Sequence, residues 1–145
     1  MGQIPGLLHL ATIEEYKKYF VNKYCKKEIV TFDGISVKFY EDQFEHAFFE
    51  SSNKKKRNKD TFSVARAIRI DWIEYVLQSP YAELHLGWDR DKKVCNKERR
   101  VAIISPEDYV VIIRLNGDKK AKFITAYYAD NSADEIRKMP LWELL

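Results

Sequence analysis

Residues 42–77 read DQFEHAFFESSNKKKRNKDTFSVARAIRIDWIEYVL, and the rest of the chain is organised around this stretch. The pattern predicts a short amphipathic helix over 41–51, a cationic loop, and a long helix that starts at residue 60. His46 falls beside the apolar stripe of the first helix. Five of the six residues from Lys54 to Lys59 are basic. An imidazole that changes charge near neutral pH therefore precedes a loop suited to polyanions.

The long helix is expected to be the main core element. Asp60 is a suitable N-cap and Pro80 a suitable stop. Arg66 and Arg69 lie beside its apolar stripe, where arginine stems often cover apolar surface while the charged heads reach water. The stripe consists of Ala65, Ile68, Trp72 and Val76, widened by Ile73 and Leu77.

Two shorter patterns precede this stretch. Thr12 and Glu15 have the spacing of a capping box, which predicts a helix beginning after Thr12. Residues 28–32 and 35–40 predict two strands joined by a two-residue turn at Asp33-Gly34, because glycine accepts the positive φ that a tight turn requires. Ile35, Val37 and Phe39 would share one face of the hairpin.

The remaining sequence is rich in strands. Alternation over 82–88 predicts a half-buried strand with His85 facing outward. Further strands are expected over 99–105, 109–115 and 121–128, and Asn131-Ser132 would cap a short last helix. This order predicts an α+β fold in which the N-terminal helices pack on one face of an antiparallel sheet of four to six strands. We expect one domain over residues 1–145, with a core over about 28–140 and residues 1–27 as an N-terminal helical extension.

Composition agrees with a folded protein, since 46% of the 145 residues are hydrophobic. The net charge is only +3, so the local clusters say more about partners than the total does. A second basic cluster lies between Arg90 and Arg100. Cys25 and Cys95 are in no Cys-x-x-Cys pair, which favours two free thiols. No secretory segment opens the sequence and no apolar run has the length of a membrane span, so we expect a cytoplasmic protein without a membrane partner.

Taken together, these residues suggest an enzyme that acts on RNA, although each has a simpler explanation. A single histidine is often a surface residue, and a charge run is often a solvated loop. His46 and Glu50 also stand four residues apart, as metal ligands on a helix can, but no third ligand accompanies them. We therefore predict no metal and no cofactor.

The order and spacing of His46, the basic loop, the segment RAIRIDWI from Arg66 and the closing FITAY of residues 123–127 resemble the phage-associated branch of the barnase–EndoU–colicin–RelE-like (BECR) nucleases. The resemblance covers roughly residues 30–140. It implies a small α+β ribonuclease fold of the RelE type. It also implies a metal-independent endoribonuclease, in many members a toxin, which would need a cognate inhibitor protein as a partner. The chain has no second histidine in the family's pattern.

The resemblance further implies the roles of individual residues. His46 matches the family's helical histidine, Thr125 and Tyr127 match hydroxyl residues on its last strand, and Arg66 matches its arginine. The reaction would be attack by the RNA 2′-OH on the adjacent phosphate. The expected catalytic residues are His46, Arg66, Thr125 and Tyr127. The expected substrate-binding residues are Lys54, Lys55, Lys56, Arg57, Lys59 and Arg69.

Other functions remain open from the sequence. A module of the same fold could bind RNA or a protein without cleaving anything. An antitoxin-like partner with exposed aromatic residues could form a protein interface. A metal-dependent nuclease is the least supported alternative, because the sequence shows no acidic cluster with ligand spacing.

Overall fold

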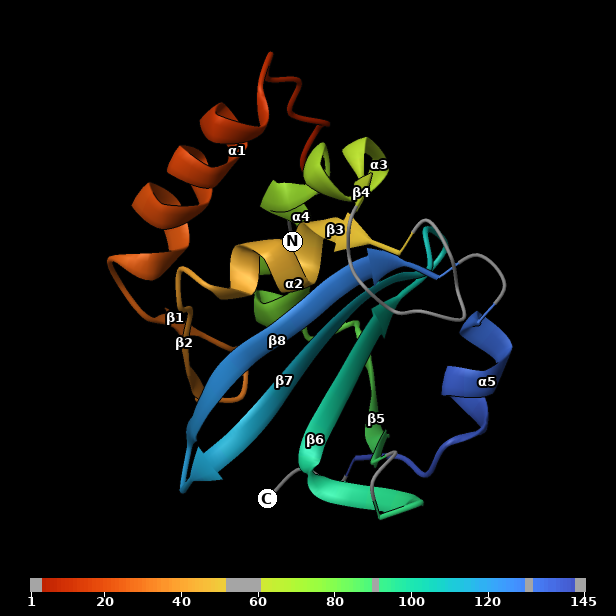
Figure 1. The fold of residues 1–145 in the computed structure, drawn as a ribbon. Coiled ribbons are helices and arrows are strands. Elements are labelled where there is room, and N and C mark those ends of the chain that lie inside the picture. The colour runs from red at the N-terminus through yellow and green to blue at the C-terminus, as the bar shows by residue number, and fades with distance from the viewer. Residues whose placement is uncertain (1–3, 52–60, 90–91, 130–131, 143–145) are drawn as a thin grey trace.

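The computed structural model describes residues 4–51, 61–89, 92–129 and 132–142. These residues form an α+β structure with one six-stranded sheet and a separate two-stranded ribbon (Figure 1). The helices are α1 (Ile13–Phe20), a π-helical turn η1 (Val21–Cys25), α2 (Gln43–Phe48), α3 (Val64–Ala67), α4 (Ile70–Gln78) and α5 (Ala133–Lys138). The strands are β1 (Ile29–Val30), β2 (Ser36–Lys38), β3 (Phe49–Glu50), β4 (Thr61–Phe62), β5 (Glu83–Asp89), β6 (Val94–Ile104), β7 (Tyr109–Gly117) and β8 (Lys120–Tyr128).

The large sheet has the strand order β1-β2-β8-β7-β6-β5. All neighbours are antiparallel except β2 and β8, which run parallel. The expectation of a purely antiparallel sheet is therefore wrong at one pair. A hairpin pattern determines how β1 pairs with β2, but it carries no information about which later strand the hairpin joins or in which direction.

The main core lies between the sheet and the helices α1, η1, α2, α3 and α4. Phe20 is fully buried near its middle, with ring centroids of Tyr24, Phe39, Phe44 and Phe48 at 5.7 to 6.0 Å. The N-terminal helix is thus part of the core, although the sequence suggests an extension outside it. Thr12 caps α1 as predicted, with its Oγ1 accepting from the Glu15 amide at 3.1 Å.

The β1–β2 hairpin forms at the predicted place. Ile35, Val37 and Phe39 are all buried, and Gly34 has φ of +88°. The Thr31 amide donates to the Ile35 carbonyl, which leaves three residues in the loop rather than two. Both cysteines are free thiols, as predicted.

The predicted long helix is broken. Asp60 lies outside the described residues, but Thr61–Phe62 form a strand and Ser63 is the N-cap, its Oγ accepting from the Arg66 amide at 3.2 Å. A second interruption at Ile68–Arg69 separates α3 from α4. This break rotates the chain, so that Ala67 and Ile70 enter the core while Ala65 is exposed. The predicted stripe is wrong at Ala65, whereas Ile68 is partly buried against the core and the positions from Trp72 onward are buried as predicted.

His85 is buried, with 3% exposure, so its predicted outward position is wrong. Its Nδ1–H donates to the Met139 carbonyl at 2.9 Å, and its Nε2 lies 3.4 Å from a Glu83 carboxylate oxygen. The C-terminal segment covers it by running along β5, where the Leu86 amide donates to the Pro140 carbonyl. Period-two alternation cannot reveal a distant segment that covers the polar face.

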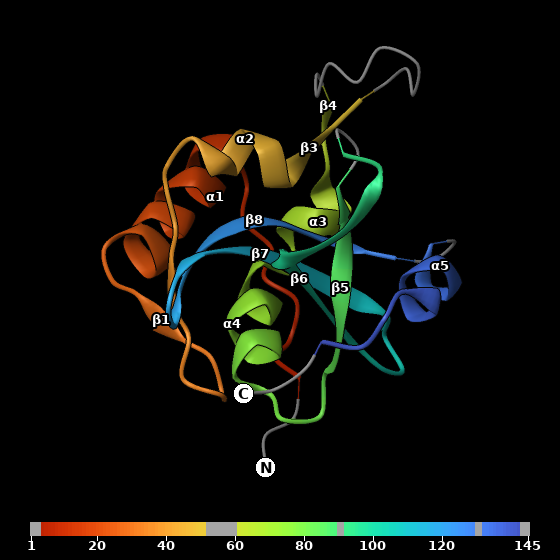
Figure 2. The same cartoon turned by 90° about the horizontal axis from the view of Figure 1, so that it is seen from below.

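The opposite face of the sheet has a smaller apolar cluster. Val101, Ile103 and Val110 pack there against Ala133 and Ile136 of α5. Figure 2 shows α5 beside β5 and β6, away from α1, α2 and α4. Since α5 covers only one end of this face, the remainder is left for the site described next.

Candidate functional site

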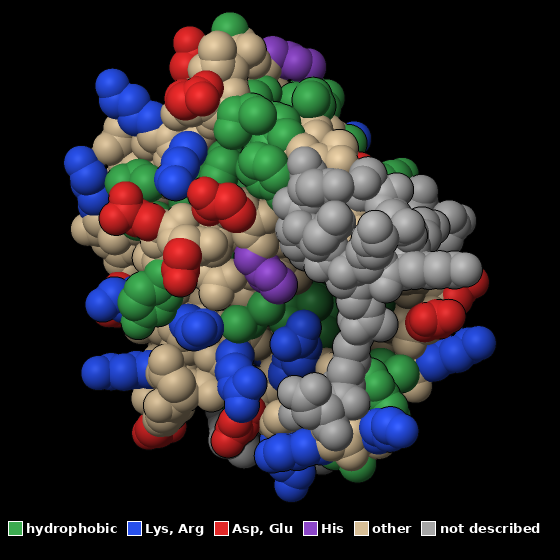
Figure 3. All heavy atoms as spheres, in the orientation of Figure 1, with side chains coloured by type: hydrophobic (Ala, Val, Ile, Leu, Met, Phe, Trp, Pro, Cys, Tyr) green, Lys and Arg blue, Asp and Glu red, His purple; other side chains and the backbone are tan. Residues whose placement is uncertain are grey.

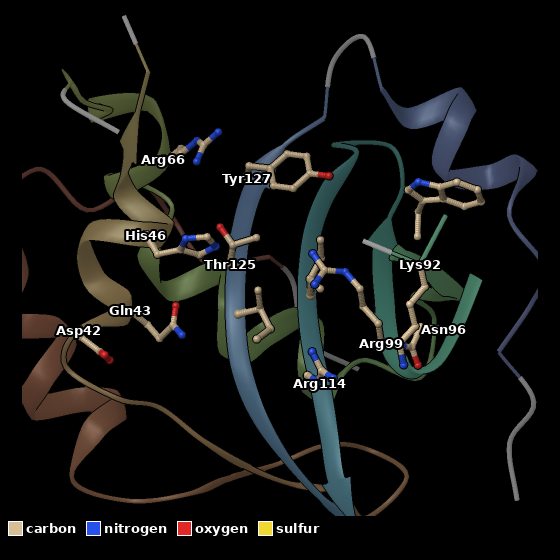
Figure 4. A pocket seen from close by; sticks show the side chains of 13 residues that line it. Asp42, Gln43, His46, Arg66, Lys92, Asn96, Arg99, Arg114, Thr125 and Tyr127 are labelled. Carbon is tan, nitrogen blue, oxygen red and sulfur yellow. The ribbon is translucent and has the colours of Figure 1, made fainter. Parts of the chain in front are cut away.

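A cleft of about 1000 Å³ opens on the sheet face that α5 leaves uncovered. It lies between β8 and helices α2 and α3 on one side and the β5–β6 hairpin on the other (Figure 4). Figure 3 shows a hollow at this place, with a histidine at its border and Lys and Arg side chains gathered below it. The lining residues are Asp42, Gln43, His46, Arg66, Trp88, Lys92, Asn96, Arg99, Ile112, Arg114, Ile124, Thr125 and Tyr127.

Strand β8 contributes the floor of the cleft. Ile112 pairs with Thr125, whereas Ile113 pairs with Phe123, so Ile124 is an extra residue in a bulge. A bulge changes the direction in which neighbouring side chains project. As a result, the consecutive residues Ile124 and Thr125 both line the cleft. Tyr127 follows two positions later on the same face.

Thr125 is only 8% exposed, and its Oγ1 has no hydrogen-bond partner among the described residues. The Gln43 side-chain oxygen, which also lines the cleft, is buried and unpartnered in the same sense. A buried polar atom without a partner costs free energy of about 1–3 kcal/mol. A polar group that enters the cleft can supply a partner to both oxygens.

His46 and Arg66 come from the helices beside β8. His46 is exposed because Phe44, Ala47 and Phe48 occupy the buried face of α2. In Figure 4 its ring extends from α2 toward Thr125. Arg66 donates from Nη1 to the Ala47 carbonyl at 3.3 Å, so it connects α3 to α2.

The Arg66 guanidinium also lies over the ring of Tyr127, with 5.6 Å from Cζ to the ring centroid. A guanidinium over a tyrosine face is a favourable cation–π geometry. The four predicted catalytic residues, His46, Arg66, Thr125 and Tyr127, therefore all line one cleft, although they come from three elements.

The far side of the cleft contains residues that the sequence reasoning did not select. Arg99 on β6 pairs in register with Arg114 on β7, and both line the cleft. Lys92 and Asn96 join them from the β5–β6 hairpin. The available signal was the second basic cluster, in which Lys92 and Arg99 belong to the cleft.

Arg100 belongs to the same basic cluster but points to the opposite face. It is 1% exposed and donates to the Asp33 carboxylate at 2.8 Å. Burial by itself would raise the pKa of Asp33, but the hydrogen bonds from Arg100 and Thr31 outweigh it and hold the pKa below 3.8. Arg100 is therefore a structural residue in the interior.

None of the predicted substrate-binding residues is among the described residues that line the cleft. Lys54, Lys55, Lys56, Arg57 and Lys59 lie outside the described residues. Arg69 does not line the cleft: its guanidinium lies 5.2 Å from the Trp72 ring and 5.2 Å from the Tyr128 ring, and it donates to the Ala65 carbonyl. The prediction that Arg69 would lie in the site with Arg66 assumed an unbroken helix. The break at residues 68–69 separates the two side chains.

The charges of the cleft favour an anion. Arg66, Lys92, Arg99 and Arg114 line it, against Asp42 as the one acidic residue among the described lining positions. No group of three or more His, Cys, Asp and Glu able to hold a metal ion occurs in the described parts of the chain. His46 and Glu50 do not form a helical pair, because α2 ends at Phe48.

Comparisons with known proteins add no relative. Neither the scan of protein-family models, nor the search of curated proteins, nor the search of solved structures found a match for this chain. Among the residues that can be described, no helix has both the length and the apolar character needed to cross a bilayer.

Proposed function

We propose that the protein is a metal-independent endoribonuclease of the BECR type, and that the cleft is its active site. The observation that supports the proposal is the meeting of an imidazole, two hydroxyls and a set of cations on one open sheet face. Cleavage of RNA by its own 2′-OH requires a proton acceptor, a proton donor and positive charge near the phosphate. The cleft offers side chains for each of these needs.

In this mechanism His46 accepts the proton of the 2′-OH. The 2′-oxygen then forms a bond to phosphorus, and the bond from phosphorus to the 5′-oxygen breaks. The leaving 5′-oxygen takes a proton from the Tyr127 hydroxyl, and exchange with water returns both side chains to their starting states. The products are a 2′,3′-cyclic phosphate and a 5′-hydroxyl.

The remaining residues stabilise the charge that develops on phosphate oxygens. The planar guanidinium group of Arg66 can donate two parallel hydrogen bonds to phosphate oxygens. The Thr125 hydroxyl can donate from the floor of the cleft, where its oxygen has no described partner. Arg99 and Arg114 would hold neighbouring phosphates from β6 and β7. DNA lacks the nucleophilic 2′-OH, so the protein should cleave RNA alone.

A second function, RNA binding without chemistry, is favoured by one observation. The chain has three histidines, and His46 is the one that lines the cleft. His9 is exposed near the N-terminus and His85 is buried beneath the C-terminal segment. A two-histidine acid–base pair therefore does not form, and a pure binder would need no such pair.

Incubation of a mixed RNA pool with the purified protein in excess EDTA separates the two functions. We expect cleavage that leaves 2′,3′-cyclic phosphate ends, and a loss of rate of about 100-fold or more in His46→Gln, which is the usual size of one general acid–base contribution. His9→Gln is the matched control and should retain wild-type activity.

Three results would contradict the proposal. Intact RNA after incubation with wild type, with salt-dependent binding retained, would establish the binding module instead. Equal cleavage by wild type and His46→Gln would remove His46 from the mechanism. Cleavage that EDTA abolishes would show a metal requirement.

A further inference from the structure

Basic side chains continue from the cleft across the sheet in a single row. Arg99 on β6 pairs with Arg114 on β7, Arg114 pairs with Lys122 on β8, and Lys122 pairs with Lys38 on β2. Residues directly opposite each other on neighbouring strands project from the same face. These four residues, called here the cationic row, therefore cross four adjacent strands on the face that contains the cleft.

The row is costly for the fold alone. Like charges directly opposite each other on paired strands are destabilising. Lysines often protect the edge of a sheet from association, but β7 and β8 are interior strands, so Arg114 and Lys122 do not lie at an edge. Glu98 lies 3.5 Å from the Arg114 guanidinium, and both side chains are largely exposed. Such an exposed pair contributes little, and an anionic ligand bound along the row would offset the repulsion between the paired cations.

An aromatic ring stands at the end of the row that is distant from Arg99. Tyr40 is 41% exposed, and its ring centroid lies 5.3 Å from the Lys38 Nζ and 5.8 Å from the Lys122 Nζ. A ring between two cations combines a stacking surface with phosphate-binding charge. This pairing of groups is what single-stranded nucleic-acid sites use.

We propose that the cationic row and Tyr40 bind single-stranded RNA and lead it across the strands, from the cleft toward β2. Three steps between strands, each of about 4.8 Å, give a track of about 14 Å, enough for a few nucleotides beyond the reacting phosphate. Figure 3 shows Lys and Arg side chains continuing below the hollow over β7 and β8. The inference rests on the proposed function, because it takes the substrate to be RNA.

Binding of a fluorescently labelled single-stranded oligodeoxythymidylate of 20 nucleotides tests the track without cleavage. The double variant Lys38→Gln/Lys122→Gln should reduce the slope of log affinity against log salt by about 1.4, since each phosphate contact contributes about 0.7 on single strands. Tyr40→Ala should weaken binding about tenfold, and Tyr40→Phe should retain wild-type affinity because the ring remains. Lys18→Gln/Lys138→Gln removes two exposed lysines from α1 and α5 and is the matched control.

The outcomes distinguish this inference from the proposed function. An unchanged salt slope in the Lys38/Lys122 variant, an equal loss in the control, or no binding by wild type would overturn the track. RNA cleavage combined with any of these results would leave the nuclease in place without the track. Salt-dependent binding that the Lys38, Lys122 and Tyr40 substitutions weaken, with no cleavage of RNA, would support the track and overturn the nuclease.

Discussion

At the scale of single residues, two adjacent arginines lie on opposite faces of the sheet. Arg99 and Arg100 follow each other on β6, so the period of two sends them to opposite faces. Arg99 reaches the cleft, whereas Arg100 is buried against Asp33 and lies near the rings of Phe32 and Trp142. Identical side chains thus line the cleft on one face and belong to the core on the other.

The Arg100–Asp33 pair makes stability depend on pH. Since the folded-state pKa of Asp33 is held below 3.8, its contribution is present above the unfolded-state pKa and is lost as pH falls through the folded-state pKa. Asp33→Asn should lower the free energy of unfolding at pH 7 by about 3 kcal/mol, because it leaves a buried guanidinium without a counter-charge. Urea titrations at a series of pH values should show this difference shrinking below pH 3.8.

The control for this experiment is Asp118→Asn, which changes an exposed carboxylate in the β7–β8 turn. Its effect on the free energy of unfolding should stay within about 0.5 kcal/mol. A difference between wild type and Asp33→Asn that does not depend on pH would show that the lost carboxylate charge is not the cause.

At the scale of elements, the geometry of the cleft depends on the helices beside it. Contacts with neighbouring elements hold these helices in place. The short helix α3 begins at the Ser63 cap, and Arg66 connects it to the end of α2. On the other side of the core, Asp71 of α4 accepts from the Tyr19 hydroxyl at 2.5 Å and from the Lys23 ammonium at 2.7 Å. Asp71 therefore joins α4 to the N-terminal helices, together with the buried Tyr24 hydroxyl, which donates to the Ile70 carbonyl at 2.6 Å.

Asp71→Ala should lower the free energy of unfolding by about 1.5–3 kcal/mol, the usual contribution of hydrogen bonds to a charged group. Glu74→Ala should have a smaller effect, since its carboxylate lies 3.7 Å from Lys23. A double-mutant cycle of Asp71→Ala with Tyr19→Phe, measured by urea unfolding, should give a coupling of at least 0.5 kcal/mol. Additive effects would mean that the two side chains do not stabilise each other.

At the scale of the whole molecule, the C-terminal segment closes one border of the sheet. The Leu86 amide of β5 donates to the Pro140 carbonyl, and the Trp142 amide donates to the Leu84 carbonyl of β5. The segment also buries His85. An uncovered β5 would present a row of free backbone groups to other chains. The segment therefore protects the sheet as well as adding to its stability.

Removal of residues 139–145 should lower the free energy of unfolding by about 2 kcal/mol or more, since several backbone hydrogen bonds and buried contacts are lost. The truncated protein should also associate with increasing concentration, which size-exclusion chromatography with light scattering would measure. A monomeric truncated protein of unchanged stability would contradict the role given to this segment. Leu141→Ser, at a largely exposed side chain, is the control that keeps the backbone contacts.

Local patterns predict much of this structure, and they do so where the cause lies within a few residues. The Thr12 cap, the positive φ at Gly34 and the burial of Ile35, Val37 and Phe39 all follow from short-range chemistry. The shared face of Thr125 and Tyr127 also follows from the period of a strand. The break at residues 68–69 does not, because neither Ile68 nor Arg69 is a helix breaker and the packing around them rotates the chain.

The candidate site also has features that local patterns predict and features that they do not. The sequence by itself determined which residue types were available: one imidazole next to the helix stripe, hydroxyls on the last strand and arginines in clusters. The tertiary structure alone decided that Arg99 and Arg114 join His46 and Thr125, that Arg69 and His85 do not, and that four cations align across β6, β7, β8 and β2. The physical reason is that register between strands and the docking of helices are set by packing across the whole core, at separations that no local period records.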